Sequence, residues 1–475
     1  MPGKTESPPP ASAPYPGALA TIREALRGGH ADFTEGSIGR AVILLAIPMV
    51  LEMALESVFA VVDVFWVSRL GGAAVATVGL TESMLALLYA IAIGLSISAS
   101  ATVARRIGER VRERAARTAV QAIALGVAIA VPLGIAGALL APRLLALLGA
   151  APDVVATGSR FTAVMLGGNV VIVLLFLINA IFRGAGDAAV AMRVLWFANV
   201  CNLVLDPCLI FGLGPFPRLG VTGAAVATTT GRGLAVLVQL ATLARGTGRI
   251  AVRREHLALE PKTMLALLRL SGSAVFQSLV GTASWIGLVR ILAAFGSAAL
   301  AGYTIAIRIV VFAILPSWGM SNAAATLVGQ NLGAKRPERS ERSVFLAGLY
   351  NMIFLGVVGF VFFAFPGALV GLFTDEPAIA PIAREGLRVI AAGFPFYAWG
   401  MVYTNAFNGA GDTWTPTLIN LGIFWLFEIP LAHVLAVRAG LGPRGVFLAI
   451  TIAFSTLAVV GGLLFRRGKW KEKRV

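Results

Sequence analysis

The string Gly184-Ala185-Gly186-Asp187 occurs a second time as Gly409-Ala410-Gly411-Asp412, at an offset of 225 residues. The same offset relates GGAAVA at 71–76 to GSAALA at 296–301. It also relates Ile107-Gly108 to Leu332-Gly333, and each pair closes a hydrophobic run beside basic residues. Three matches in one register across 475 residues indicate an internal duplication, so each copy must contain the same number of helices.

The composition is that of a membrane protein. The chain is 58% hydrophobic and only 13% charged, with a mean hydropathy of +0.85, whereas soluble domains are about 25% charged. Segments 118–140 and 351–365 contain no Asp, Glu, Lys or Arg. Apolar runs of this length predict an all-α polytopic membrane protein.

Twelve hydrophobic runs are expected to cross the bilayer as helices, six on each side of the basic segment 245–264. The runs lie at 42–67, 74–104, 115–146, 156–182, 188–213, 221–244, 265–294, 299–330, 343–373, 380–408, 413–437 and 445–465. Because six is even, each copy begins and ends on the same membrane face, which predicts two parallel six-helix bundles rather than inverted repeats. A cleft between such bundles is the expected substrate route of an alternating-access carrier.

The formal net charge of +16 comes largely from residues that flank the spans. Basic side chains crowd the loops after spans two, six and eight and the C-terminal tail, at Arg105, Arg106, Arg110, Arg112, Arg114, Arg117, Arg245, Arg249, Arg253, Arg254, Lys262, Lys335, Arg336, Arg339, Arg342, Arg466, Arg467, Lys469, Lys471, Lys473 and Arg474. The loops at 294–298 and 374–378 contain none. The positive-inside rule therefore predicts a cytoplasmic (inner) membrane protein with both termini in the cytosol. Anionic lipid headgroups, and not nucleic acid, are the expected polyanionic partners.

The predicted organisation has five segments. Residues 1–40 form a disordered cytosolic segment with a short amphipathic helix at 18–28, because residues 1–17 contain six prolines and no apolar run. The two bundles occupy 41–245 and 265–466, joined by a cytosolic linker at 246–264. A basic cytosolic tail follows at 467–475. We expect a monomer and no enzyme activity. The two GAGD strings are interpreted as tight turns in which the aspartate caps the next helix.

The first span contains three acids, Glu52, Glu56 and Asp63, at spacings of four and seven residues that place them on one helical face. Charged groups inside a membrane are costly, so acids there are functional candidates. For Glu52 and Glu56, hydrogen bonding to neighbouring helices is an equally good explanation. Asp63 is the stronger candidate for a functional role.

The fifth span contains a second polar stripe, formed by Asn199, Asn202 and Asp206 at spacings of three and four. Pro207 lacks an N–H and leaves the carbonyl of Leu203 without its helical partner beside Asp206. Carboxylate, amide and carbonyl oxygens suit Na⁺, or a proton shared between coupled acids. In the 225 register the mates of Asp63 and Asp206 are leucines, at 288 and 431, so the cation chemistry is predicted for the first half alone.

Other polar residues in the spans are interpreted as packing or interhelical hydrogen-bond residues. They are Glu82, Arg232, Gln277, Arg308, Glu428 and His433. A secondary polar cleft is predicted at Glu52, Glu56, Asn199, Gln277 and Tyr397.

From about residue 35 to 465 the chain resembles the multidrug and toxic compound extrusion (MATE) family. The resemblance rests on Ile47-Pro48, on Asp63 followed by Arg69-Leu70-Gly71, and on the strings at 183–187, 202–207, 220–225 and 408–412. It implies secondary active antiport of amphipathic, often cationic drugs against H⁺ or Na⁺, with no other cofactor or metal. It also implies a cation-coupling site at Asp63, Asn179, Asn202, Asp206 and Thr228.

One departure from the family concerns span seven, where some members have an acid eight residues after an opening proline. Here those positions are Ser273 and Gly281, so the resemblance does not extend to a cation site in the second half. Two rival functions share parts of this pattern. A lipid-linked saccharide flippase of the same layout would need a cationic cleft for pyrophosphate. An intramembrane aspartyl protease would use the GAGD strings, but the duplication already explains both.

Overall fold

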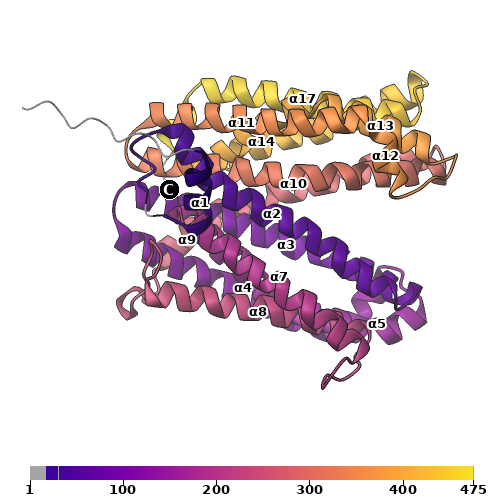
Figure 1. The fold of residues 1–475 in the computed structure, drawn as a ribbon, viewed down its shortest axis with the longest axis horizontal. Helices are drawn as coiled ribbons and strands as arrows, with labels where there is room; N and C mark the ends of the chain where they lie inside the picture. Colours follow the sequence, from indigo (N-terminus) through magenta and orange to yellow (C-terminus); the bar gives the residue numbers. More distant parts are fainter. Residues whose placement is uncertain (1–17, 30, 474–475) are drawn as a thin grey trace, which may run out of the picture.

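The structure is a computed structural model that describes residues 18–29 and 31–473, without the side chains of Ala18, Ala60, Val61, Asp63 and Val64. All regular secondary structure within these residues is helical (Figure 1). The α-helices are α1 (Ala18–Arg27), α2 (Ile38–Ser68), α3 (Gly72–Gly108), α4 (Arg112–Leu147), α5 (Pro152–Gly167), α6 (Asn169–Ala185), α7 (Ala188–Phe211), α8 (Val221–Arg245), α9 (Pro261–Ala293), α10 (Ser297–Gly333), α11 (Pro337–Ala364), α12 (Pro366–Gly371), α13 (Ala380–Ala392), α14 (Phe394–Gly409), α15 (Trp414–Asn420), α16 (Ile429–His433) and α17 (Pro443–Arg466). Short 3₁₀-helices are η1 (Arg254–His256) and η4 (Lys469–Glu472), and π-helices are η2 (Leu421–Glu428) and η3 (Val434–Arg438).

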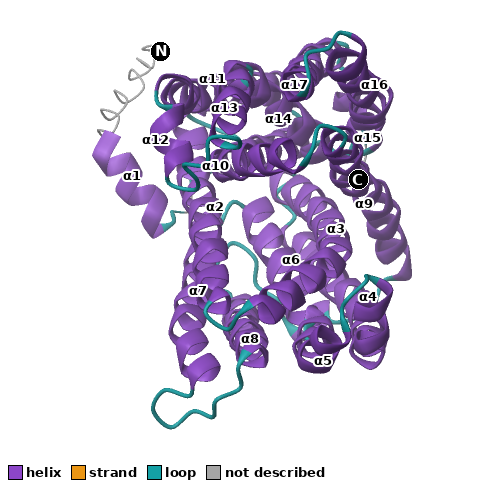
Figure 2. Cartoon of the chain, turned by 90° about the vertical axis from the view of Figure 1, so that its right-hand side faces the viewer, coloured by secondary structure: helices purple, strands orange, loops and turns teal. Residues whose placement is uncertain are grey.

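Within the described residues, eleven helical segments are long and apolar enough to cross a membrane. The fourth is formed by α5 and α6 together, over Pro152–Ala185. The remaining predicted span, 380–408, is divided between α13 and α14 at Gly393. Helices α2–α8 form one bundle and α10–α17 the other, with α2 and α9 on opposite sides of the seam between them (Figure 2). The all-α fold with two bundles is as the sequence predicts.

The backbone repeats with the same 225-residue register as the sequence. Gly71 and Gly296 both precede a long helix, with φ of 98° and 95°. Gly186 and Gly411 both have positive φ, as do Arg110 and Lys335, the non-glycine residues with positive φ among those described. Spans four and ten both break at a glycine, Gly168 and its mate Gly393. Because turn geometry and helix breaks match at equivalent positions, the duplication extends to three-dimensional structure.

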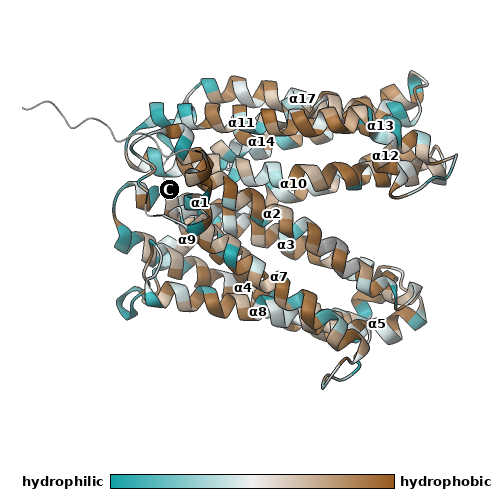
Figure 3. Cartoon of the chain, viewed as in Figure 1, coloured by the Kyte–Doolittle hydropathy of each residue, from teal (hydrophilic) through white to brown (hydrophobic). Residues whose placement is uncertain are grey.

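The end of the molecule that includes the loops 105–117, 245–262 and 334–342 and the described C-terminal residues is called the basic end. Hydrophilic residues gather there, at the left of Figure 3, and apolar residues dominate the helices. The two bundles lie close together at the basic end and diverge towards the other end (Figure 1). The Thr326 hydroxyl donates to the Arg183 carbonyl at 3.2 Å, and the Gln330 amide donates to the Gly184 carbonyl at 2.9 Å. These bonds join the second half to the first.

Glycines allow this close approach. A Cβ at Gly108 of α3 would overlap the carbonyl of Gln330 on α10, and a Cβ at Gly333 of α10 would overlap the carbonyl of Arg105 on α3. Each contact is the 225-register mate of the other. Helices α3 and α10 therefore cross in a pseudo-symmetric pair that seals the basic end.

The segment after α1 lies across the basic end and contacts both halves. Arg110, between α3 and α4, donates to Asp32 at 3.2 Å and to Glu35 at 2.9 Å. From the second half, Arg339 donates to the carbonyls of Phe33, Glu35 and Gly36. Burial acts to raise the pKa of the Asp32 carboxyl, but hydrogen bonds from Thr34 and the charges of Arg110 and Arg249 outweigh it and lower that pKa. We call residues 31–37 with these arginines the clasp.

The capping role predicted for the GAGD aspartates is wrong. Asp187 stands at the N-cap of α7 but its side chain makes no cap hydrogen bond. It accepts from the backbone N–H of Arg249 at 2.5 Å and pairs with that residue's Nε at 3.4 Å. Its mate Asp412 accepts from Thr415 and pairs with Lys473 at 3.3 Å. Each aspartate therefore contacts the segment that follows its own bundle, Asp187 the linker at Arg249 and Asp412 the C-terminal tail at Lys473.

Candidate functional site

The first predicted site residue, Asp63, lies on α2 seven residues beyond Glu56, and its side chain is outside the part that the structure describes. Helix α8 runs antiparallel to α2, and Thr228 precedes Arg232 on it. The position of Asp63 in the site therefore remains a prediction from helical spacing.

Three of the predicted coupling residues meet between α7 and α8, and we call them the aspartate cluster: Asn202, Asp206 and Thr228. All three are buried, and Asp206 is 0% exposed. In its better hydrogen-bonded amide orientation, Asn202 donates to Oδ2 of Asp206 at 2.7 Å and accepts from the Thr228 hydroxyl at 2.9 Å. Carboxylate, amide and hydroxyl groups thus meet at one buried position between the two helices. Such oxygens can bind Na⁺ or a proton.

Glycine positions α8 for this contact. A Cβ on Gly231 would lie 3.0 Å from the carbonyl of Ala198 and 3.3 Å from the backbone nitrogen of Asn202. The absence of a side chain at Gly231 lets α8 approach α7 closely enough for Thr228 to reach Asn202. The close approach is a consequence of tertiary packing that spacing alone does not predict.

Asn179, the remaining predicted coupling residue, belongs to a separate group that we call the glutamate cluster. Its amide donates to Oε1 of Glu52 at 3.1 Å, and its oxygen accepts from Gln239 at 2.7 Å. Arg183 donates to the same Glu52 oxygen at 2.7 Å, and Glu52 is 1% exposed. The structure therefore links α2, α6 and α8 through a buried ion pair, and Asn179 bonds to Glu52 instead of joining the aspartate cluster.

Glu56 also has a cationic partner. Arg232 of α8 donates to its Oε1 at 3.4 Å and to the hydroxyl of Tyr89 at 3.1 Å. Since Thr228, Arg232 and Gln239 lie four and seven residues apart, α8 presents all three on one face towards the bundle interior. The glutamate cluster, the Glu56–Arg232 pair and the aspartate cluster therefore all include a residue from one face of α8.

Sequence reasoning missed Arg183 and Gln239, and it interpreted Arg232 as a packing or interhelical hydrogen-bond residue, which its bonds to Tyr89 and Glu56 fit. Arg183 entered only as the first residue of the family string at 183–187, although it lies one helical turn from Asn179 and hence on the same face. Gln239 lies seven residues from Arg232, so the polar spacing on α8 was also available. With these residues, both glutamates of the first span are neutralised by arginines.

The other predicted polar-cleft residues do not join these clusters. Asn199 is 7% exposed on α7, and its amide nitrogen has no hydrogen-bond partner among the described residues. Gln277 and Tyr397 lie on α9 and α14 of the second half. The structure therefore does not assemble the predicted secondary cleft as one site.

The second half also contains a buried acid. Glu428, interpreted as a packing or hydrogen-bonding residue, is 2% exposed at the end of η2. Among the described residues it makes neither a hydrogen bond nor an ion pair. Its position near the 225-register mate of Asp206, Leu431, could have drawn attention to it.

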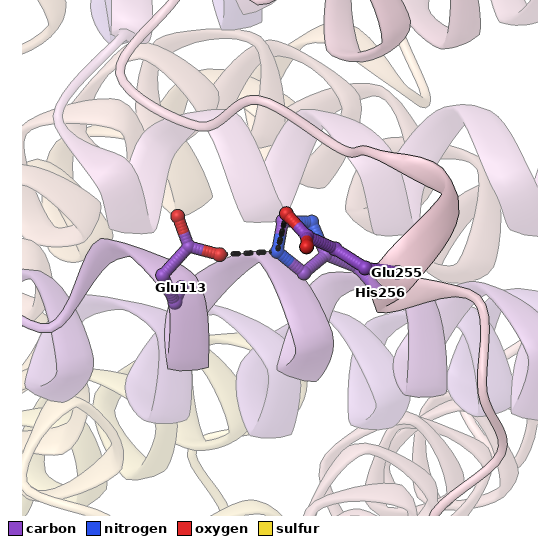
Figure 4. Close-up of side chains that lie close together, drawn as sticks. All are labelled: Glu113, Glu255 and His256. Carbon is purple, nitrogen blue, oxygen red and sulfur yellow. Dashed lines mark hydrogen bonds and ion pairs between the residues drawn. The ribbon is translucent and has the colours of Figure 1, made fainter.

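Three side chains of types that can bind a metal ion lie close together at the basic end (Figure 4). They are Glu113, Glu255 and His256, and each places one ligand atom within 4.8 Å of those of the other two. His256 is 1% exposed, and its Nδ1 accepts from the N–H of Arg253 at 3.0 Å. In the neutral ring Nε2 then bears the proton and donates to Glu113. Because this bonding satisfies both ring nitrogens, we assign the group to fastening the linker onto α4.

A cavity of about 680 Å³ lies at the basic end between α3, α4, α9 and α15. It is distant in sequence from the intramembrane acids and is lined by six cations, namely Arg106, Arg114, Arg117, Lys262, Arg269 and Lys473, with Glu260 and Asp412. Its chemistry suits an anion and differs from that of the aspartate cluster.

Known proteins share both halves of this architecture. The chain is similar to the probable multidrug resistance protein NorM of Thermotoga maritima, with 27% identity over 68% of this chain and 69% of that protein. It is similar to an FAD transporter of Shewanella oneidensis, with 25% identity over 87% of this chain and 91% of the relative. An outward-facing multidrug resistance MATE family transporter of the MOP superfamily superposes with a TM-score of 0.87 at 26% identity, over 93% of this chain and 98% of that one.

The family model MatE matches residues 48–208 and again residues 273–434, once in each half and in the 225 register. The two matches cover more than half of the chain. The protein therefore belongs to the MatE family of membrane transporters.

Proposed function

We propose that this protein is a secondary active antiporter that exports amphipathic, often cationic compounds in exchange for H⁺ or Na⁺. The observation that supports the proposal most directly is the aspartate cluster. Asp206, Asn202 and Thr228 provide a fully buried set of oxygen ligands between two helices of the first half. The nearby glutamates have arginine partners, so they are less available to a coupling cation.

Binding of a proton or Na⁺ at the aspartate cluster would remove negative charge from the first half. A cationic substrate in the same half would then bind less tightly, and linkage requires each ligand to weaken the other equally. Competition of this kind couples export to the entry of the ion. Asp63 is proposed as a second member of the site, on the evidence of its helical face.

Alternating access follows from the two bundles. Contacts between α3 and α10 and the clasp close the basic end, and the bundles diverge at the opposite end. The positive-inside rule favours the basic end as cytosolic, in which case this conformation faces outward. Opening the basic end requires α3 and α10 to separate where they cross, at Gly108 and Gly333.

The test is efflux of a fluorescent organic cation from proteoliposomes under separately imposed H⁺ and Na⁺ gradients. Asp206→Asn keeps the volume of the side chain and removes its charge. We expect it to abolish gradient-driven efflux, with normal insertion and folding. Asp63→Asn should have the same effect.

Asp153→Asn is the matched control, since Asp153 is exposed at the start of α5. It should transport like the wild type. Wild-type efflux by both Asp206→Asn and Asp63→Asn under either gradient would refute the coupling site.

A second candidate function is export of a bulky anion. The cation-lined cavity at the basic end supports it, together with the similarity to an FAD transporter. A lipid-linked saccharide with a pyrophosphate belongs to the same chemical class. The same proteoliposomes loaded with FAD would discriminate, because efflux of FAD and not of organic cations would favour this candidate.

A further inference from the structure

Glu428 is a buried acid with no charged partner. It ends the π-helix η2 and is followed by Ile429 and Pro430 within the eleventh span. It is 2% exposed and makes no hydrogen bond or ion pair with any residue that the structure describes. The two glutamates of the first span, by contrast, both have arginines.

Two buried tyrosines face the same region. Tyr303 of α10 is 3% exposed and Tyr397 of α14 is 2% exposed, and neither hydroxyl has a hydrogen-bond partner of normal geometry among the described residues. Tyr397 lies near Thr451, whose hydroxyl bonds to the carbonyls of Val389 and Phe447. Both tyrosines belong to the apolar core that also contains Ala432 and against which Ile429, the residue after Glu428, packs. Three polar groups from three helices are therefore enclosed together in an apolar core.

No cation compensates the carboxyl. The elements packed against η2 are α9, α15, α16 and α17. Their titratable side chains are Lys262, Arg269, Arg290, His433, Arg444 and Arg466. Among the described residues none of these forms an ion pair with Glu428, and Arg444 pairs with Glu385 instead. The same holds for Arg308, which shares α10 with Tyr303 and interacts with Glu82.

An ionised carboxylate without a partner is very costly in such surroundings, and protonation removes the charge that causes this cost. We propose that Glu428, with Tyr303 and Tyr397, is a proton-binding site of the second half, occupied in this conformation and emptied when the eleventh span repacks. The reaction is the binding of one proton to one carboxylate. Water on one side of the membrane supplies the proton, and water on the other side accepts it.

The π-helix offers a means of release. Its turns contain one residue more than α-helical turns, and such segments are frequent at functional sites. Conversion of η2 to α-helix would rotate Glu428 relative to Trp414 and the start of the span, and would change what surrounds the carboxyl. The inference rests on the proposed alternating-access cycle for this movement, but not on which ion the aspartate cluster binds.

The first measurement is infrared difference spectroscopy on the full-length protein in lipid, with and without substrate, following the carbonyl band of protonated carboxyl groups. We expect Glu428→Gln to lose one such band. Glu385→Gln is the matched control, because Glu385 is a half-exposed acid of the same half that pairs with Arg444. It should keep the band.

Asp206→Asn should also keep this band, which separates failure of the first-half site from failure of this one. Glu428→Asp retains a carboxyl and should retain a shifted band, so the question can be answered even if the glutamine variant folds poorly. In proteoliposomes, Glu428→Gln should export substrate with one proton fewer exchanged per cycle. An unchanged spectrum in Glu428→Gln, or a band that does not respond to substrate in the wild type, would overturn the proposal.

Discussion

At the scale of single residues, the first half is organised by the pairing of Glu52 with Arg183. The two side chains are 1% and 12% exposed, and Asn179 contributes a further hydrogen bond to the same carboxylate. A buried pair of this kind contributes little net stability compared with apolar residues, but removal of one partner leaves an uncompensated charge.

We therefore expect Arg183→Gln to destabilise the protein by about 3–5 kcal/mol, because Glu52 would be left charged and buried. The double variant Glu52→Gln with Arg183→Gln should recover most of that loss. Thermal unfolding in detergent measures both. Arg290→Gln is the matched control, since Arg290 is exposed at the end of a span and should change little. Equal losses in the single and double variants would contradict the charge argument.

At the scale of elements, the crossing of α3 and α10 sets the state of the basic end. The contact is backbone to backbone at Gly108 and Gly333, so neither helix can yield through a side-chain rotation. The clasp adds polar contacts from Arg110 and Arg339 across the same end. Two features thus close this end: the steric fit of α3 against α10, and the clasp that bridges both halves.

Gly108→Ala should force α3 and α10 apart, because the new methyl group would overlap the carbonyl of Gln330. We expect the closed basic end to lose population and the thermal midpoint to fall. Gly79→Ala tests the same change on the same helix, and nothing lies within 4 Å of a Cβ there. That control should be neutral or stabilise the protein by about 0.4–1 kcal/mol. Similar effects of the two substitutions would show that packing at Gly108 is unimportant.

At the scale of the whole molecule, polar residues and the described C-terminus lie at one end, and the helices between the ends expose apolar side chains (Figure 3). Basic residues concentrate at that end, and the membrane would orient the protein accordingly. The loop at Ser297 lies at the opposite end from Glu338, because α10 joins them as one continuous span.

Cysteine labelling tests this orientation in a background with Cys201→Ser and Cys208→Ser. Ser297 and Glu338 are both exposed. Ser297→Cys should react with an impermeant reagent in intact cells, and Glu338→Cys only after permeabilisation. The reverse pattern would invert the predicted topology.

The sequence by itself determined the duplication, the number of spans and their parallel arrangement. These properties depend on spacing and hydropathy along the chain, which folding does not alter. Asn202 and Asp206 could also be grouped in advance, because four residues in one helix fix their relative positions. Tertiary structure decided the partners. Glu52 pairs with Arg183, 131 residues away in the chain, Asp187 binds the linker instead of its own helix, and Glu428 forms no ion pair with any described residue. The energy of a buried charge depends on which helices lie beside it, and helix adjacency is a property of the packed molecule alone.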